Sequence, residues 1–291
     1  MIKVTASALS QVTKSTAAGT HYTAAQKYPK GVGIDGVGVT QSGQRVFFVM
    51  PKAPFGGMAE KVLVPKEHCI PVPDGVDDVL AAAIGNPGLS SMAALKSRAD
   101  FKAGDTVLVH GATGDAGKLA VQISKYLGAK KVIATGRDAA TLQHLKTVGA
   151  DVTVSLTLEP KELEQALGEQ FSGEGVDIVL DYLYGERTEA LLAILAKTSK
   201  RSKPIRYVVI GSRSGSDITL PSAYLRGLPI MFMGSGLGSV SMKDFLAATR
   251  DVFQAILPAK LEVETLIVPL ADVEKTWNAE SGRSRVVFVI K

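Results

Sequence analysis

Cysteine is almost absent from this chain of 291 residues, in which Cys69 is the single one. One thiol excludes disulfide bonds within the chain and a zinc site built from several cysteines, and it is typical of a reducing compartment. Histidines are few as well, and they do not have the spacing of metal ligands. They are His21, His68, His110 and His144. We therefore expect no bound metal ion.

Long apolar runs are also missing. No apolar segment approaches the roughly 18 residues that span a bilayer. The N-terminal MIKVTASALSQV is polar and alternating, without the apolar centre of a signal peptide. Internal repeats and low-complexity segments are absent too. With 46% hydrophobic and 21% charged residues, the composition is that of a soluble globular protein, which we expect to be cytoplasmic.

The charge balance gives little sign of a nucleic-acid partner. The formal net charge is +5, and the positive residues are spread along the chain except for one cluster, KTSKRSK at 197–203. This cluster follows the helix-like run ERTEALLAILAKTS, and cations are favourable at a helix C-terminus. No aromatic residues are interleaved with the charges. We interpret the cluster as a solvated helix end, with a nucleic-acid patch or a sorting signal as the less favoured alternative.

The chain has two contrasting textures. Up to about residue 79, short strand-like segments such as QRVFFVM are punctuated by glycine and proline, which predicts a small barrel or a curled sheet. From about residue 80, six strand-like segments alternate with helix-like ones, the pattern of a doubly wound parallel sheet. After the helix-like MKDFLAATRDVFQAIL the tail is β-rich again. We predict one domain from residues 1–83 and 258–291, and an α/β domain from residues 84–257.

One segment of the α/β part resembles a dinucleotide-binding unit. Residues 106–138 read TVLVHGATGDAGKLAVQISKYLGAKKVIATGRD, a strand, a glycine-bearing turn, a helix and a second strand within about thirty residues. The usual pattern is G-x-G-x-x-G, and here Ala112 takes the place of the first glycine. A small residue suits a turn whose first position has a negative φ. The alternative is a tight turn that binds nothing.

The remaining loop residues have the properties that a pyrophosphate site requires. Thr113 precedes Gly114, where the lack of a side chain lets the backbone approach the pyrophosphate. The N–H groups of Asp115 and Ala116 are expected to point at the phosphates from the helix N-terminus. Gly117 is expected to let the helix pack closely on the strand.

The end of the second strand distinguishes the two nicotinamide cofactors. An NAD site usually has Asp or Glu there, which accepts hydrogen bonds from the ribose hydroxyls. This strand instead ends with Gly136 and Arg137. Gly136 leaves room for a 2′-phosphate, and the planar guanidinium of Arg137 offers donors to it. Asp138 is expected to cap the following helix. The pattern favours NADPH over NADH.

The segment FKAGDTVLVHGATGDAGKLAVQISKYLGA strongly resembles the zinc-independent quinone oxidoreductase branch of the medium-chain dehydrogenase/reductase superfamily. Other segments also match the family, in the family's order, along nearly the whole chain. They are GVGIDGVGVT with GQRVFFV, FGGMAEKVLVPKEHCIPVPDGV, AAAIGNPGLSSMAAL, VDIVLDYLYG and SGRSRVVFVIK. The resemblance implies a Rossmann-type doubly wound parallel sheet plus a GroES-like β-barrel domain. It also implies a homodimer that pairs the edge strand near 229–235, since exposed apolar edges associate.

Two departures from related patterns matter. The family usually begins with an extra β-hairpin before the strand that here reads IKVTASALS, so we expect a shortened GroES-like domain. The zinc ligands of the alcohol dehydrogenase branch are also replaced, by LSQ at 9–11 and GID at 33–35. We expect Asp35 to be a structural hydrogen-bond acceptor. A zinc-dependent mechanism is therefore not expected.

The resemblance and the missing ligands imply NADPH-dependent hydride transfer to a quinone or to the C=C of an α,β-unsaturated carbonyl. The charge then develops on a delocalised enolate oxygen, which needs only hydrogen-bond donors and a proton source. Tyr22 is one candidate donor, or else a surface tyrosine in a loop. Asn86 is another, or else a helix cap before Pro87. A non-catalytic NADPH-binding protein with a structural or regulatory role is the main alternative, and a zinc-free alcohol dehydrogenase is a weaker one.

The cofactor contacts are predicted from the loop, from the strand ends and from the resemblance. By resemblance, the residues after the fourth strand lie near the adenosine, the fifth strand ends at the ligand-binding edge, and the sixth contributes beside the nicotinamide. Each has an alternative role in packing. The predicted set is Thr113, Gly114, Asp115, Ala116, Gly117, Gly136, Arg137, Leu183, Tyr184, Ile210, Gly211, Ser212, Phe232, Met233, Gly234 and Arg283.

Overall fold

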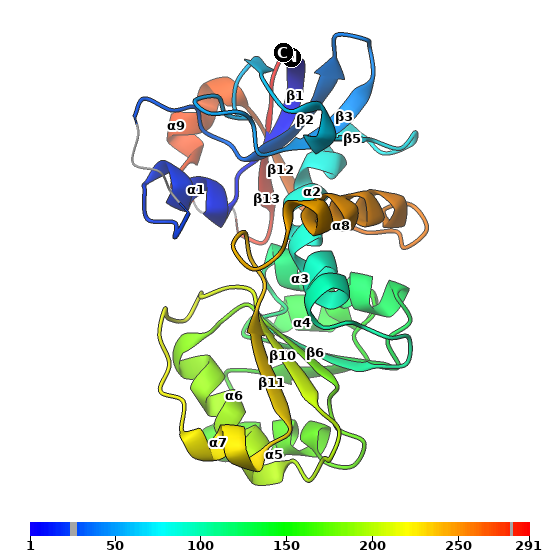
Figure 1. Cartoon of the computed structure of the whole chain (residues 1–291), viewed down its shortest axis with the longest axis vertical. Helices are drawn as coiled ribbons and strands as arrows, with labels where there is room; N and C mark the ends of the chain where they lie inside the picture. Colours follow the sequence, from blue (N-terminus) through cyan, green and yellow to red (C-terminus); the bar gives the residue numbers. More distant parts are fainter. Residues whose placement is uncertain (24–27, 280–281) are drawn as a thin grey trace. The chain divides into compact units, whose positions relative to one another are not determined.

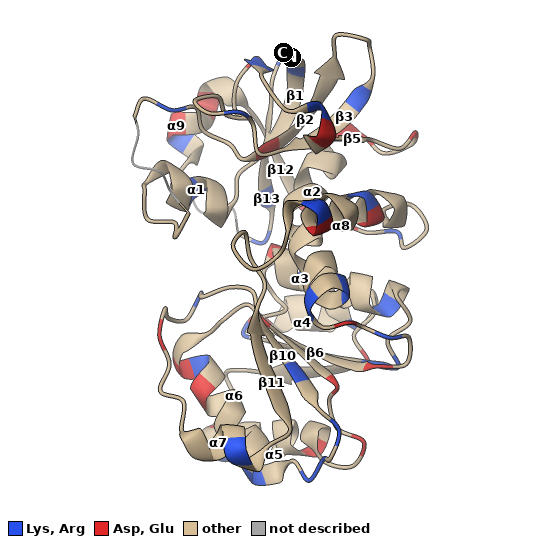
Figure 2. Cartoon of the chain, viewed as in Figure 1, with Lys and Arg blue, Asp and Glu red and all other residues tan. Residues whose placement is uncertain are grey.

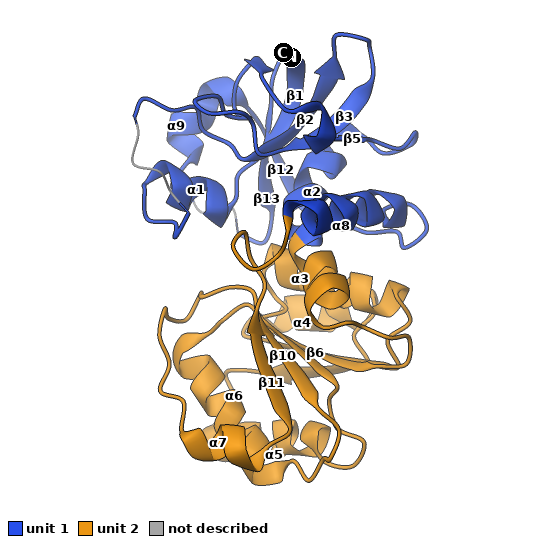
Figure 3. Ribbon diagram, viewed as in Figure 1, with its two compact units in different colours: residues 1–89, 242–291 blue, residues 90–241 orange. Residues whose placement is uncertain are grey.

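The computed structural model describes residues 1–23, 28–279 and 282–291. It divides into two compact units, unit 1 with residues 1–89 and 242–291 and unit 2 with residues 90–241 (Figure 3). Each unit is built around its own sheet. The chain leaves unit 1 once, builds unit 2, and returns. The structural boundaries differ from the predicted ones at 83/84 and 257/258, mainly because the helix after unit 2 belongs to unit 1.

Unit 2 contains a six-stranded parallel sheet in the order β11-β10-β9-β6-β7-β8 (Figure 1). This is the predicted doubly wound order, in which the first strand of the unit lies at the centre and the direction of winding reverses beside it. The strands are β6 Thr106–His110, β7 Lys131–Gly136, β8 Val152–Ser155, β9 Ile178–Asp181, β10 Ile205–Val209 and β11 Ile230–Gly234.

Three helix boundaries of unit 2 lie at residues that typically mark them. Gly128, with a φ of 92°, follows the end of α3 (Asp115–Tyr126). Asp138 caps α4 (Ala139–Leu145), and its carboxylate accepts a hydrogen bond from the N–H of Thr141 at 2.7 Å. Pro160 opens α5 (Pro160–Phe171). The remaining helices are η2 Ala94–Arg98, α6 Gly185–Thr198 and α7 Ser222–Gly227.

Unit 1 is mostly β and contains both ends of the chain. Its seven-stranded sheet has the order β12-β13-β1-β2-β3-β5, and β4 also pairs with β1. The C-terminal β13 runs antiparallel to β1, so the tail returns to the first domain as predicted. The strands are β1 Ile2–Ala8, β2 Asp35–Thr40, β3 Arg45–Val49, β4 Lys61–Val62, β5 Cys69–Pro71, β12 Thr265–Pro269 and β13 Arg285–Val289.

Two helices pack closely against this sheet. α2 (Asp78–Ala93) carries Gly85, where a Cβ atom would lie 2.3 Å from the ring of Phe47. On the other side Phe47 meets Phe253 of α8 (Met242–Ala255), with ring centroids 4.9 Å apart. This aromatic packing places α8 in unit 1, although its sequence continues the helix–strand alternation of unit 2. The shorter helices are α1 Gln11–Ala17, η1 Lys66–His68, η3 Leu270–Asp272 and α9 Val273–Thr276.

Acidic and basic residues are interspersed on the ribbon of each unit (Figure 2). The basic cluster at 197–203 is only partly the solvated helix end that we predicted. Arg201 forms an ion pair with Asp177, and its side chain is only 8% exposed. Lys197, in the last turn of α6, forms an ion pair with Glu164. Among the described helices, none is long and apolar enough to cross a membrane.

Candidate functional site

The loop between β6 and α3 has the geometry that its glycines predict. At Gly117 a Cβ atom would lie 2.3 Å from the carbonyl oxygen of Gly111, so only glycine lets α3 begin this close to the strand. At Gly114 a Cβ atom would meet nothing within 4 Å. The packing of the protein therefore does not require a glycine at 114, and the space above it is open. The first N–H groups of α3 have no partners within the helix and begin at this open point.

At the end of β7, Gly136 is needed for a reason other than the one predicted from the sequence. A Cβ atom there would lie 2.3 Å from the Cγ2 methyl of Thr113, so packing against Thr113 already requires glycine at position 136. Arg137 follows Gly136, is exposed, and forms no hydrogen bond or ion pair with the described part of the chain. The carboxylate of Asp138 caps α4. Arg137 is therefore the charged side chain that β7 presents at this edge.

The turn after β9 is organised by Asp181, which is completely buried. One carboxylate oxygen accepts hydrogen bonds from the N–H groups of Leu183 at 2.8 Å and Tyr184 at 3.1 Å. These bonds hold Tyr184 at a φ of 55°, in the left-handed region that residues other than glycine rarely adopt. Gly185 follows with a φ of 60°. The backbone after β9 is thus fixed in an unusual conformation by one buried carboxylate.

The second oxygen of Asp181 accepts hydrogen bonds from the hydroxyls of Tyr207, at 2.8 Å, and Thr188. Burial and the neighbouring Asp181 raise the pKa of Tyr207 well above its ordinary value, so the phenol remains a donor at physiological pH. The ring of Tyr207 also stacks on Phe232 of β11, with centroids 4.7 Å apart. The network therefore links three neighbouring elements, β9, β10 and α6.

His110 continues this polar row across the sheet. It lies opposite Thr135 of β7 on one side and Asp181 of β9 on the other. Burial lowers the pKa of His110, so the ring is neutral at pH 7. Its Nε2 lies 3.3 Å from the carbonyl oxygen of Arg187, which can only accept, so Nε2 carries the proton. The hydroxyl of Thr135, 2.9 Å from Nδ1, is then the donor to the ring.

Close contacts at two glycines bring the loops after β6, β9 and β10 together at the carboxyl edge of the sheet. A Cβ atom at Gly111 would lie 2.9 Å from Leu183, and one at Gly211 would lie 2.6 Å from the carbonyl oxygen of Tyr182. The predicted residues at 113–117, 136–137, 183–184 and 210–212 therefore gather at this edge. Those at 232–234 lie in β11, in register with residues 207–209 of β10. Ligands of doubly wound sheets bind at such an edge.

Three predicted site residues, Tyr22, Asn86 and Arg283, belong to unit 1. Tyr22 is 71% exposed and lies against the ring of His21, with centroids 4.3 Å apart. Arg283 is exposed. Asn86 lies inside α2, eight residues from its first residue Asp78, so the alternative of a helix cap is wrong. Pro87 follows it within the same helix, which therefore continues through a residue that usually ends helices.

The structure reveals a buried acid, Asp35, whose role sequence reasoning missed. It is the first residue of β2 and is only 1% exposed. Its main-chain oxygen accepts a hydrogen bond from the Ser7 hydroxyl at 2.9 Å, but neither carboxylate oxygen has a hydrogen-bond partner. The prediction that the side chain is a structural acceptor is therefore wrong. Burial raises the pKa of Asp35 to about 7, although Arg285 and Asn86 act in the opposite direction.

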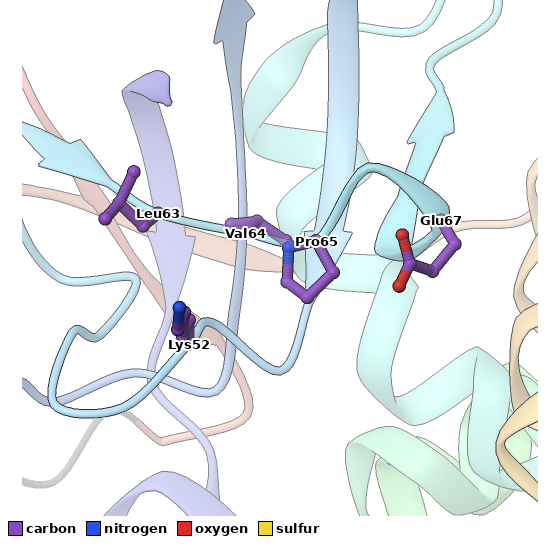
Figure 4. Close-up of a pocket in the computed structure, with 5 residues that line it drawn as sticks. All are labelled: Lys52, Leu63, Val64, Pro65 and Glu67. Atoms are coloured by element: carbon purple, nitrogen blue, oxygen red, sulfur yellow. The ribbon is translucent and has the colours of Figure 1, made fainter.

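An open groove of about 610 Å³ lies on unit 1, lined by Lys52, Leu63, Val64, Pro65 and Glu67 (Figure 4). It contains none of the predicted site residues. Within residues 1–23, 28–279 and 282–291, no group of three or more His, Cys, Asp or Glu side chains is arranged to hold a metal ion.

Comparison with known proteins adds independent information. Residues 116–254 match a family described as zinc-binding dehydrogenase. The chain is 28% identical over 327 residues to the "Probable NADPH-dependent quinone reductase tdiC" of Emericella nidulans, with 99% of this chain and 91% of that protein covered. It is 27% identical over 296 residues to the quinone oxidoreductase of Sus scrofa, with 96% and 83% covered. Among solved structures, the quinone oxidoreductase of Thermus thermophilus, determined alone and with NADPH, is similar with a TM-score of 0.80 and 27% identity, with 99% and 90% covered.

Proposed function

Because the chain belongs to the quinone oxidoreductase-like branch of the medium-chain dehydrogenase/reductase superfamily, we propose that it transfers a hydride to a quinone or to the C=C of an α,β-unsaturated carbonyl. The chain is an enzyme, an oxidoreductase whose cofactor is NADPH. The preference between quinone and enone, and the absence of zinc from the reaction, are parts of the proposal. The observation that carries it is the carboxyl edge of the unit 2 sheet, where Arg137 lies exposed and Asp138 is used as a helix cap.

The residues at this edge fit an NADPH molecule. The open space above Gly114 admits a pyrophosphate, and the first turn of α3 supplies N–H donors and the positive end of the helix dipole. The exposed guanidinium of Arg137 has the charge and the planar donor geometry to bind a 2′-phosphate. Asp181 fixes the turn at Leu183 and Tyr184, which suits a rigid wall beside the adenosine. Bound NADPH supplies the hydride.

The chemistry that remains for the protein is to stabilise a developing oxyanion. Hydride addition to an enone or a quinone places negative charge on an oxygen, and hydrogen-bond donors aimed at that oxygen lower the barrier. We propose that the amide of Asn86 and the hydroxyl of Tyr22 are these donors. Zinc independence is supported by the segments LSQ at 9–11 and GID at 33–35, which stand where the alcohol dehydrogenase branch has its zinc ligands.

A homodimer is also part of the proposal. β11 is an edge strand of the six-stranded sheet, and Met231 on it is 51% exposed. An apolar strand edge of this kind favours pairing with a second copy. Light scattering is expected to give twice the mass of the chain, and a monomer at micromolar concentration would refute this part of the proposal.

The experiment that tests the cofactor assignment replaces Arg137 with alanine. Hydrogen bonds to charged groups contribute about 1.5–3 kcal/mol each, so R137A is expected to weaken NADPH binding by about 10- to 100-fold. NADH binding is expected to stay the same. Fluorescence titration of both cofactors measures the two affinities. Arg250, an exposed arginine on α8, provides the matched control R250A, which should change neither. Equal losses for NADPH and NADH in R137A would refute the assignment.

A second assay separates catalysis from binding. NADPH oxidation is followed with a panel of quinones, enones and enals in the presence of a metal chelator. The proposal predicts turnover with at least one class and no effect of the chelator. Tight NADPH binding without turnover of any of them would favour the alternative, a protein that binds NADPH for a structural or regulatory purpose.

A further inference from the structure

The buried carboxyl of Asp35 is an unusual feature of unit 1. A carboxyl group that leaves water without gaining hydrogen bonds is costly, and such groups call for a specific explanation. Asp35 is 1% exposed and neither of its carboxylate oxygens has a partner. Its backbone is also held in place from two directions. The Ser7 hydroxyl donates to its carbonyl oxygen, and a Cβ atom at Gly57 would lie 2.3 Å from the same oxygen. The acid therefore cannot readily move out to solvent.

Two side chains from other elements face this carboxyl. Arg285, the first residue of β13, is 5% exposed and is the charged group, among the described residues, that lowers the pKa of Asp35. Asn86 reaches it from α2. The Asn86 amide is close enough to lower the pKa of Asp35, yet it does not satisfy hydrogen-bond geometry with either carboxylate oxygen. From β1, the Ser7 hydroxyl bonds to the main chain and not to the carboxyl. Beside the Arg285 cation, Asn86 thus presents to Asp35 a carboxamide, which has a donor end and an acceptor end.

We propose that Asp35 is a positioning residue that determines which end of the Asn86 carboxamide faces away from it. A protonated Asp35 donates to Oδ1 of Asn86, and the Nδ2 amide then faces away as a donor. An ionised Asp35 instead accepts from Nδ2, and Oδ1 then faces away as an acceptor. A half-turn of the carboxamide exchanges the two states without moving the backbone of α2.

The two states have opposite consequences for the proposed reaction, on which this inference rests. A donor at Asn86 stabilises the oxyanion that hydride addition creates, whereas an acceptor repels it. The protonated form of Asp35 is therefore the active one. Because burial raises the pKa of Asp35 to about 7 against the effects of Arg285 and Asn86, both forms are populated near neutral pH.

The kinetic test is the pH dependence of kcat for NADPH oxidation with a good acceptor. The wild type is expected to lose activity tenfold per pH unit above about 7, the pKa of Asp35. D35N has no proton to lose, and its amide oxygen faces the Arg285 cation while its NH₂ donates to Asn86. It should keep the low-pH rate across the whole range. N86A should be slow at every pH and should also lose the step, because Asp35 acts through Asn86.

Other kinetic outcomes would overturn the proposal. If kcat of D35N still falls above pH 7, the titrating group is not Asp35. If N86A keeps the fall in kcat above pH 7 and D35N is inactive, Asp35 gives its proton directly to the substrate. D78N is the matched control, because Asp78 is a unit 1 acid whose carboxylate is paired with Arg45 at 2.8 Å. It should keep the wild-type pH profile.

A second measurement does not depend on turnover. The side-chain amide resonance of Asn86 in a ¹H–¹⁵N spectrum, assigned by its loss in N86A, should shift with a midpoint near pH 7 in the wild type and stay constant in D35N. A resonance that does not titrate in the wild type overturns the proposal, whatever the activity. A resonance that titrates in a protein without activity upholds the coupling of Asp35 to Asn86 and refutes the proposed function instead.

Discussion

The buried carboxyl of Asp35 makes a quantitative prediction about stability. Its pKa is raised from 3.8 to about 7 in the folded chain, mainly by burial. Between these two values the folded state binds more protons than the unfolded state, so the free energy of unfolding falls as pH rises and is level again above pH 7. A rise of this size corresponds to about 4 kcal/mol. The variant D35N cannot ionise, so relative to wild type it should gain up to about 4 kcal/mol by pH 8, with little difference near pH 4.

Urea unfolding at several pH values between 4 and 8 measures this difference. The single tryptophan, Trp277, packs in unit 1 against a cluster that includes Phe288, so its fluorescence reports the unfolding of the unit that contains Asp35. The difference in free energy of unfolding between D35N and wild type should grow with pH and level off near pH 7. Parallel pH dependences for the two proteins would show that Asp35 titrates normally and would refute the reasoning.

Two further predictions concern unit 2. G117A should lose both stability and NADPH affinity, because its Cβ atom would lie 2.3 Å from the carbonyl oxygen of Gly111. G114A should lose NADPH affinity alone, because its Cβ atom meets nothing within 4 Å. Thermal unfolding and NADPH titration of both variants check this, and equal melting temperatures of G117A and G114A would contradict it. Y207F removes one donor to the buried Asp181 and should cost about 1–3 kcal/mol in urea unfolding, so an unchanged stability would show that the bond contributes nothing net.

Much of unit 2 could be predicted from local sequence signals. The alternation of short apolar strands with capped helices predicted a six-stranded parallel sheet, and the sheet was found in the doubly wound order. Asp138 and Pro160 marked helix starts because capping depends on residues only a few positions apart. The loop glycines are predictable for the same reason. Since parallel strands end at one edge, the gathering of the cofactor residues there followed from the topology.

The surroundings of Asp35, the place of α8 and the helical position of Asn86 depend on contacts between residues far apart in the sequence. Nothing in the sequence around Asp35 indicates that Asn86 and Arg285 will face its carboxyl, because these residues come from β2, α2 and β13. The assignment of α8 to unit 1 depends on the packing of Phe253 on Phe47. The alternative that Asn86 caps a helix depended on Pro87, which follows it, but α2 continues through both residues.

The most direct test of the central claim, metal-free hydride transfer from NADPH to an activated double bond, follows the hydride itself. The protein, freed of metal ions by chelation, is incubated with an enone and NADPH that carries deuterium on the transferred position of C4. Mass spectrometry and NMR then locate the label. The account predicts one deuterium at the β-carbon of the saturated product. If NADPH binds but no acceptor takes up the label, or if transfer requires added zinc, the account is contradicted.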